Sequence, residues 1–175
     1  QFAARLKDPA ARARLKKDKD FETWAREHGW WDGIVMARAA PPPNQKYEGL
    51  RPSETAKMRG DADPMDTCIN LMAEDGGRIS GIFHRMSEED VRAVMKRPWV
   101  AVASDGSAIN LDAPGVPHPR NYSTNARVLG HYVRDEKVLT LPDAVRKMTS
   151  LPASILGLTD RGQLKTGFAG DVVVF

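Results

Sequence analysis

Residues 99–103 form a run of five apolar side chains that leads directly into Ser104, Asp105 and Gly106. A short run without a polar interruption is typical of a strand that is covered on both faces, as in a parallel sheet between two layers of helices. In α/β folds, active sites are built at the carboxyl ends of such strands. The run therefore predicts a buried strand that ends with Asp105 at the functional edge of a sheet.

Short apolar runs alternate with helical patterns along the rest of the chain. Further strands are expected at residues 34–37, 79–84 and 171–175. Helices are expected over residues 2–28, up to a stop at Gly29, and at five later places, near residues 53–59, 64–75, 87–97, 124–136 and 141–156. This alternation predicts an α/β architecture with parallel strands and right-handed crossovers. A closed barrel needs about eight strands, so we expect the chain to be part of a larger fold.

Several helix starts are marked by residues that suit the N-cap position. Asp8 and Asp63 each precede a proline, and proline is favoured at the first helical position. Ser87 and Thr140 each stand three residues before an acidic residue, in the pattern of a capping box. We expect a helix to begin at each of these four positions.

The composition excludes several classes of protein. One Cys among 175 residues excludes an internal disulfide and a Cys-rich zinc site. No apolar run approaches the roughly 18 residues of a membrane-spanning helix, so no membrane partner is expected. Residues 1–20 hold seven basic and three acidic side chains, but no aromatic side chain lies among the basic ones to stack on bases. We expect a solvated helix face there and no nucleic-acid partner.

Asp105 is the first candidate for a catalytic residue. A carboxylate at the end of a buried strand is partly dehydrated and can act as a general base or bind a metal ion. The alternative is that Asp105 caps its own turn through hydrogen bonds of the Asx type.

Arg120 is the second candidate, in the loop that follows Asp105. Pro117 and Pro119 stiffen the backbone beside it, and a guanidinium held in this way suits a bidentate grip on a carboxylate. The alternative is an ordinary exposed arginine. His118, between the two prolines, is either a ligand or proton carrier, or a surface imidazole.

The other histidines and the cysteine are expected to be structural. His84 ends the strand at 79–84 and would share an edge with Asp105 if the strands are parallel, but a packed role is the simpler interpretation. His28 and His131 lie on expected helices without partners at metal-ligand spacing. Cys68 lies in the apolar stripe of a helix, where burial is expected.

Residues 99–106, followed by residues 118–120, resemble the last barrel strand and the next loop of the N-acyl-D-amino-acid deacylases (D-aminoacylases), a family of the amidohydrolase superfamily. Four further segments resemble the closing helices and the C-terminal return strand of that family: residues 127–130, 141–153, 160–162 and 167–175. The resemblance covers residues 34–175 and is most specific from residue 86 onward.

The resemblance implies an α/β fold that is the C-terminal part of a (β/α)8 barrel, together with the last strand of a small β-domain. Residues 34–158 are then the last strands and helices of the barrel, and residues 159–175 return to the small β-domain. Residues 1–33 are expected to be a helical insertion. Since the first residue is Gln, we expect the natural N-terminus to lie further upstream.

The resemblance also implies an activity, which is hydrolysis of the N-acyl amide bond of N-acyl-D-amino acids by a zinc-activated water in the cytoplasm. Asp105 matches the residue that takes the proton from this water and passes it to the leaving amine. Arg120 matches the residue that binds the substrate carboxylate, and His118 is expected to contact the substrate from the same loop.

The zinc ligands of that family, a Cys and two His on earlier strands together with an early His-x-His region, have no counterpart here, and Cys68 lies on a helix. We therefore expect zinc to be bound by a remaining N-terminal part of the barrel, as a partner of this chain, and the chain by itself to be inactive.

Two alternatives remain at this stage. One is a cyclic amidase of the same superfamily, similar to dihydroorotases or hydantoinases, which shares the barrel and the Asp at a strand end. The loop with His118 and Arg120 favours an open-chain N-acyl amino acid over a cyclic amide. The other alternative is a non-catalytic fragment or interaction domain, which would bind partners through exposed sheet edges or through the basic helix at residues 1–20.

Overall fold

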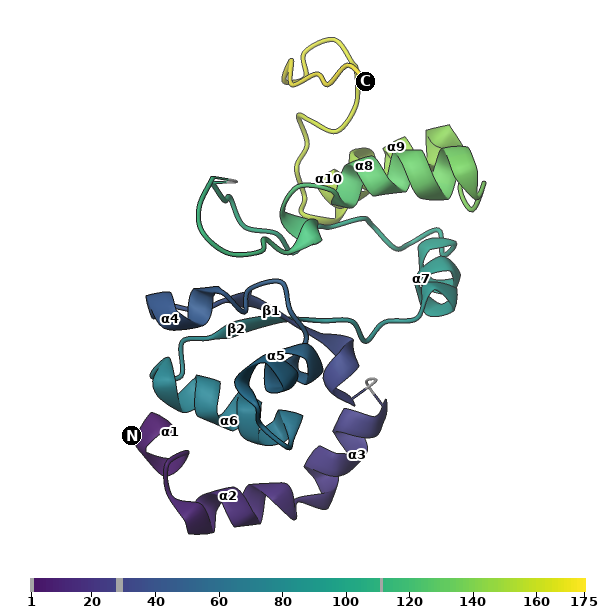
Figure 1. Ribbon diagram of the computed structural model, residues 1–175. Helices are drawn as coiled ribbons and strands as arrows, with labels where there is room; N and C mark the ends of the chain where they lie inside the picture. Colours follow the sequence, from purple (N-terminus) through teal and green to yellow (C-terminus); the bar gives the residue numbers. More distant parts are fainter. Residues whose placement is uncertain (1, 28–29, 111) are drawn as a thin grey trace. The chain divides into compact units, whose positions relative to one another are not determined.

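The computed structural model describes residues 2–27, 30–110 and 112–175. The chain divides into two compact units, one made of Gln1–Arg85 with Ile109–His118 and the other of Met86–Ala108 with Pro119–Phe175 (Figure 1). The expected helix stop at Gly29, and His28 beside it, lie outside the described residues.

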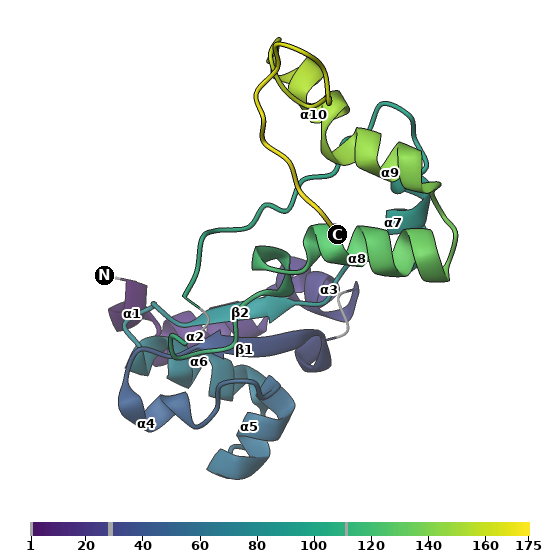
Figure 2. The same cartoon turned by 90° about the horizontal axis from the view of Figure 1, so that it is seen from above.

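The first unit contains a two-stranded sheet. Strand β1 (Ile34–Arg38) pairs with β2 (Ser80–Phe83), and both strands lie where the apolar runs predict them (Figure 2). The pair is antiparallel, with Ile34 opposite Phe83 and Arg38 opposite Ser80. The expected parallel arrangement is therefore wrong for these two strands. The physical reason is that the segment between the strands, which contains α4 (Pro42–Gln45), α5 (Pro52–Arg59) and α6 (Pro64–Glu74), returns the chain so that β2 starts beside the carboxyl end of β1.

The single helix expected over residues 2–28 is wrong, because this part of the described chain forms three shorter helices, whereas the helix starts predicted after Asp8 and Asp63 are confirmed. The helices of the first unit are α1 (Phe2–Arg5), α2 (Pro9–Lys16), α3 (Lys19–Glu27), the 3-10 turn η1 (Trp30–Gly33), α4 (Pro42–Gln45), α5 and α6. The carboxylates of Asp8 and Asp63 accept the N–H groups of Ala10 and Met65, each at 2.9 Å, as the sequence predicts. Helix α5 begins one residue before Ser53 and ends at Gly60, whose left-handed φ of 77° suits glycine.

Two apolar clusters form the core of the first unit. One joins α1 to α6, and the other packs β1 and the segment after it against α6. Their buried members are Leu6, Met65, Ile69 and Ala73 in the first cluster, and Met36, Ala39, Tyr47 and Leu71 in the second. Residues 109–118 are also held here, because the Val116 N–H donates to the Ala37 carbonyl at 2.7 Å. At Gly115, with φ 107°, a side chain would lie 2.9 Å from that same carbonyl.

The second unit is helical. Its elements are α7 (Glu88–Met95), the 3-10 turn η2 (Pro119–Asn121), α8 (Thr124–Arg127), the π-helix η3 (Val128–Asp135), α9 (Leu141–Met148) and α10 (Ser150–Ile155). The hydroxyls of Ser87 and Thr140 accept the N–H groups of Asp90 and Asp143 at 3.0 and 3.3 Å, so the predicted caps of α7 and α9 are confirmed. The core of this unit is made of four buried residues, Val128, Tyr132, Leu139 and Ala144.

Two expected strands do not form in the described chain. Residues 100–110 and 171–175 have no regular secondary structure. An apolar run becomes a strand only when a neighbouring strand accepts its hydrogen bonds, and β1 and β2 pair with each other in the first unit. The Val102 N–H donates instead to the Lys147 carbonyl of α9, at 3.0 Å. The side chains of residues 172–175 are exposed.

Helix α9 holds the segment that leads to Asp105. The side chain of Lys147 is fully buried, and its ammonium donates to the carbonyls of Arg97 and Val100, the latter at 3.1 Å. The neighbouring guanidinium of Arg146 donates to the Pro98 carbonyl at 2.8 Å. Because these carbonyls lie in an irregular segment, the two side chains of α9 replace the partners that a sheet would otherwise supply. None of the described helices is long and apolar enough to cross a membrane.

Substitution Lys147→Met should destabilise the second unit. Methionine keeps most of the buried side-chain volume but cannot donate to the carbonyls of Arg97 and Val100, so the free energy of unfolding should fall by about 2–4 kcal/mol. Urea unfolding, followed by circular dichroism, measures this change. Lys96→Met, at an exposed residue next to α7, is the matched control and should change it by less than about 0.5 kcal/mol. Equal effects of the two substitutions would contradict the role assigned to Lys147.

Candidate active site

Asp105 lies between Ser104 and Gly106 in a short turn that is closed by a side-chain hydrogen bond, within a segment that has no regular secondary structure. Its backbone has a left-handed φ of 50°, a conformation that Asp adopts more readily than most residues. The hydroxyl of Ser104 accepts the Gly106 N–H at 3.1 Å and so caps this turn. The side chain of Asp105 is 86% exposed. The turn therefore presents its carboxylate to solvent.

The structure brings the two leading candidates together. Arg120 lies in η2, and its Nη1 is 2.9 Å from Oδ2 of Asp105. The Arg120 side chain is 47% exposed, so both partners of this ion pair remain in contact with solvent. An exposed ion pair contributes about 0–1 kcal/mol to stability. Because it contributes so little, a ligand can replace either partner at small cost.

A largely apolar groove of about 440 Å³ lies beside Arg120 within the second unit. One wall is α7, another is the irregular segment 100–103, and η2, α8, η3 and Lys147 of α9 also line the groove. Its lining includes Val91, Val94, Met95, Arg120, Arg127, Val128 and Tyr132. Volumes of this size are typical of small-molecule sites.

A polar cluster fixes the walls of this groove to one another. Glu88, at the start of α7, accepts hydrogen bonds from the Tyr132 hydroxyl at 2.7 Å and from Arg127 at 2.8 Å. Further along α7, Arg92 forms two hydrogen bonds of 2.7 Å with Glu136. The hydrogen bond from Tyr132, with the charge of Arg127, lowers the pKa of Glu88. The sequence indicates Glu88 only as part of a helix cap, and no local signal marks its distant partners.

The histidines considered in the sequence analysis lie elsewhere in the structure. His131 has its Nε2 3.1 Å from Glu136, which agrees with the structural role expected for it. His84 is exposed after β2, so the packed role expected for it is wrong, and its backbone N–H donates to the Gly33 carbonyl at 2.7 Å. His84 and His118 belong to the first unit. Since β1 and β2 are antiparallel, the argument for His84 at the edge of Asp105 no longer holds, and a substrate contact by His118 stays a prediction.

The described residues do not fit a zinc site. Within residues 2–27, 30–110 and 112–175, no group of three His, Cys, Asp or Glu side chains is placed to hold a metal ion. Cys68 is half-buried in α6, and burial raises the pKa of its thiol to about 12. A thiol that stays protonated at neutral pH is a poor zinc ligand, because zinc binds the thiolate.

Comparison with known proteins decides the family. Residues 55–175 match the amidohydrolase family. The chain belongs to this family. Over 94 residues, this amidohydrolase chain is 47% identical to an N-acyl-D-glutamate deacylase and 44% identical to a D-aminoacylase, both from Alcaligenes xylosoxydans xylosoxydans. These 94 residues are 54% of the chain but 18% and 19% of the two enzymes, so the chain spans about a fifth of their length.

Solved structures of deacylases share the fold of this amidohydrolase chain. The N-acyl-D-glutamate deacylase from Bordetella bronchiseptica, complexed with zinc and a phosphonate inhibitor, superposes with a TM-score of 0.68 at 31% identity, over 83% of this chain and 28% of that one. A D-aminoacylase with a binuclear metal centre gives a TM-score of 0.64 at 33% identity, over 79% of this chain and 27% of that one. The chain therefore has an α/β amidohydrolase fold similar to that of D-aminoacylases.

Loss of the Glu88 carboxylate should change how stability depends on pH. A pKa lowered by folding adds stability above the unfolded value of about 4.3, and this stability is lost as the pH falls through the folded value. Glu88→Gln should therefore lose less stability than the wild type between pH 6 and pH 3, as measured by urea unfolding at each pH. Glu89→Gln changes the exposed neighbour of Glu88 on α7. Between pH 6 and pH 3, its free energy of unfolding should change as that of the wild type does. If both variants show the same pH dependence, the Glu88 contacts do not matter for stability.

Proposed function

We propose that this chain is the part of a metal-dependent N-acyl-D-amino-acid deacylase that carries the proton-transfer group and the substrate-carboxylate clamp. The observation that carries the proposal is the 2.9 Å approach of Asp105 and Arg120, in a chain of the amidohydrolase family. An acid–base group and a cationic clamp within reach of one another suit a small substrate that has an amide bond next to a carboxylate.

Arg120 binds the α-carboxylate of the substrate. In this structure its guanidinium already lies at ion-pair distance from a carboxylate, that of Asp105. A substrate carboxylate would bind the same positive charge and accept hydrogen bonds from the same planar guanidinium. The relatives that are deacylases of N-acyl-D-glutamate and N-acyl-D-aspartate support this role, because both substrates carry an α-carboxylate.

Asp105 moves the proton. As the oxygen of the attacking water forms a bond to the acyl carbon, the carboxylate of Asp105 takes the proton of that water. When the C–N bond breaks, Asp105 delivers the proton to the amine nitrogen, and the products are a carboxylic acid and a D-amino acid. The exposure of the Asp105 side chain gives water and the leaving amine access to its carboxylate.

Zinc belongs to this proposal as a cofactor bound elsewhere in the protein. Solved relatives contain zinc or a binuclear metal centre, whereas the described residues of this chain do not fit such a site. We therefore assign the metal to the N-terminal part of a (β/α)8 barrel and route no step through it here. In that barrel, residues 99–103 would be a strand, residues 159–175 would return to the small β-domain, and residues 1–33 would be an insertion. This chain by itself is expected to be inactive.

The choice of substrate tests the proposal as a whole. The complete protein, loaded with zinc, should hydrolyse N-acetyl-D-amino acids and should leave hydantoins and dihydroorotate intact. Hydrolysis of the cyclic amides in place of the open-chain substrates would assign the site to a cyclic amidase instead. The absence of both activities in the zinc-loaded protein would favour a non-catalytic role.

Asp105→Asn should abolish turnover in the complete enzyme. An amide cannot take the proton of the water, so kcat should fall by about 10²–10⁴-fold. The thermal midpoint should stay near that of the wild type, because the lost contact is an exposed ion pair. Steady-state kinetics and calorimetry measure the two effects. Asp112→Asn, at another exposed carboxylate of the same loop, is the control and should retain full activity. Turnover of Asp105→Asn close to that of the wild type would exclude the proton-transfer role.

Arg120→Ala should weaken the binding of substrates that have a free α-carboxylate. Loss of a charge-assisted pair of hydrogen bonds costs about 1.5–3 kcal/mol, which corresponds to an increase in KM of roughly 10- to 150-fold. Methyl esters of the same substrates should be affected much less. Arg134→Ala removes an exposed arginine that is paired with Asp135. It should leave the KM values for the acids and for the methyl esters unchanged. Equal losses with acids and esters would show that Arg120 does not bind the carboxylate.

A further inference from the structure

We propose that Asn121 is a positioning residue, which sets the distance between the proton-transfer group and the carboxylate clamp. The inference rests on the proposed function of Asp105 and Arg120 and concerns a residue that neither contributes a proton nor binds the substrate carboxylate. Asn121 follows Arg120 directly, at the end of η2. Its side chain therefore starts from the element that carries the clamp.

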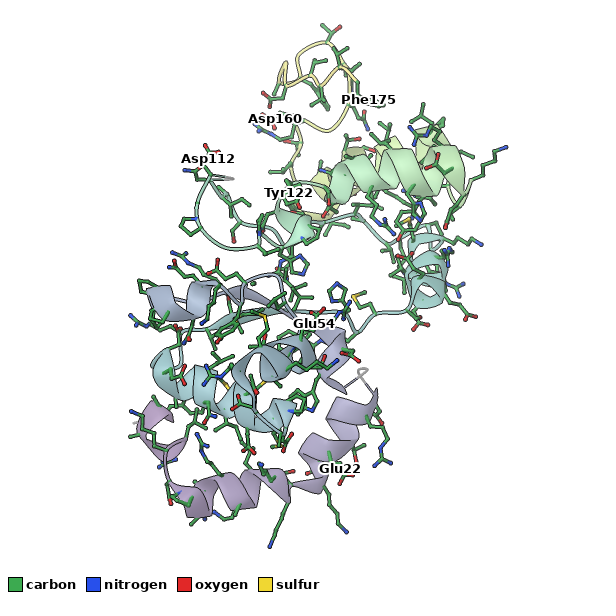
Figure 3. The ribbon with its side chains drawn as sticks, viewed as in Figure 1. Glu22, Glu54, Asp112, Tyr122, Asp160 and Phe175 are labelled. Atoms are coloured by element: carbon green, nitrogen blue, oxygen red, sulfur yellow. The ribbon has the colours of Figure 1, made fainter. Side chains whose placement is uncertain are left out.

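The side chain of Asn121 reaches the turn that carries Asp105. Its Oδ1 accepts the backbone N–H of Ser107 at 2.9 Å, only two residues after Asp105. One hydrogen bond thus ties the backbone of the acid–base turn to the helix of the clamp, although the two residues are separated by 14 positions in the sequence. Figure 3 labels Tyr122, the next residue along the chain, and shows this loop with its side chains.

Gly106 makes this close approach possible. A Cβ atom at Gly106 would lie 2.8 Å from the Arg120 carbonyl and 3.1 Å from the Asn121 Cα. Gly106 is not among the glycines with a positive φ, so the space and not the backbone conformation requires glycine here. The far side of η2 is also held, because the Pro119 carbonyl accepts both the N–H and the hydroxyl of Ser123, at 2.9 and 2.7 Å.

The ion pair between Asp105 and Arg120 does not set this distance, because it opens whenever Arg120 turns to a substrate carboxylate. The Asn121 hydrogen bond does not involve either charged group, so it persists while the guanidinium changes partner. The amide bond of a substrate held by Arg120 then meets Asp105 at a fixed distance. A misplacement of about 1 Å at such a site can reduce the rate by about a hundredfold.

The first experiment compares two asparagines of the same loop in the complete, zinc-loaded enzyme. Asn121→Ala removes the acceptor for the Ser107 N–H, and Asn110→Ala removes the similar acceptor for the Asp112 N–H, at 3.0 Å, in the first unit. With N-acetyl-D-amino acids, Asn121→Ala should lower kcat by about 10- to 100-fold while KM changes by less than about threefold. Asn110→Ala should keep the wild-type kcat. Calorimetry should show both variants folded.

The second experiment is a double-mutant cycle. It separates the two roles, because a merely structural Asn121 would cause the same loss of kcat with and without Arg120. In the Arg120→Ala background the substrate is no longer held by the clamp, so Asn121→Ala should lower kcat by less than about threefold further. Gly106→Ala forces the segment around Asp105 and η2 apart, because its Cβ would lie 2.8 Å from the Arg120 carbonyl. It should lower kcat as much as Asn121→Ala does. The double variant should lower kcat no further than either single variant.

The results that would contradict the positioning role differ from those that would contradict the proposed function. A kcat of Asn121→Ala equal to that of Asn110→Ala would exclude the positioning role, as would fully additive losses with Arg120→Ala. If the wild-type enzyme hydrolyses no N-acyl-D-amino acid, the proposed function fails, and the positioning role fails with it. Wild-type activity together with an unaffected Asn121→Ala overturns the positioning role and leaves the proposed function intact.

Discussion

The buried ammonium of Lys147 is the contact on which the second unit depends. It donates to the carbonyls of Arg97 and Val100, and its own carbonyl accepts the N–H of Val102. A single residue of α9 thereby holds both sides of the irregular segment between α7 and Asp105. Burial of a lysine costs free energy unless carbonyl or carboxylate oxygens accept hydrogen bonds from its ammonium group. The contact therefore favours the one path of residues 97–102 that supplies these oxygens. The direction in which the chain enters the Asp105 turn follows from it.

Strong and weak interactions are divided between the scaffold and the candidate site. The scaffold uses buried or multiple contacts, such as the bond of Tyr132 to Glu88 and the paired bonds of Arg92 to Glu136. The site uses an exposed ion pair, which opens at little cost. This division suits a site whose charged groups have to exchange partners with a substrate, because the backbone around them does not need to move.

Local features were predictable because their energetics are local. The N-caps at Asp8, Asp63, Ser87 and Thr140 satisfy N–H groups two or three residues away, so the sequence contains both partners. Strand pairing is different, since the partner is remote. The apolar run before Asp105 predicts a strand, but no strand of the described chain pairs with it, and it remains irregular. The parallel arrangement of β1 and β2 was predicted wrongly for a related reason, because the helical segment between the strands returns the chain beside the carboxyl end of β1.

The sequence by itself determined the four helix starts that carry an N-cap side chain, the presence of Asp105 after an apolar run, and the stiffened loop that carries Arg120. These depend on neighbours within a few residues. Tertiary structure decided that Asp105 and Arg120 meet at 2.9 Å, that Asn121 receives the N–H of Ser107, and that Lys147 becomes a buried anchor. These contacts join residues between 14 and 50 positions apart. The chain must fold before either partner of such a contact finds the other, and so no local pattern indicates them.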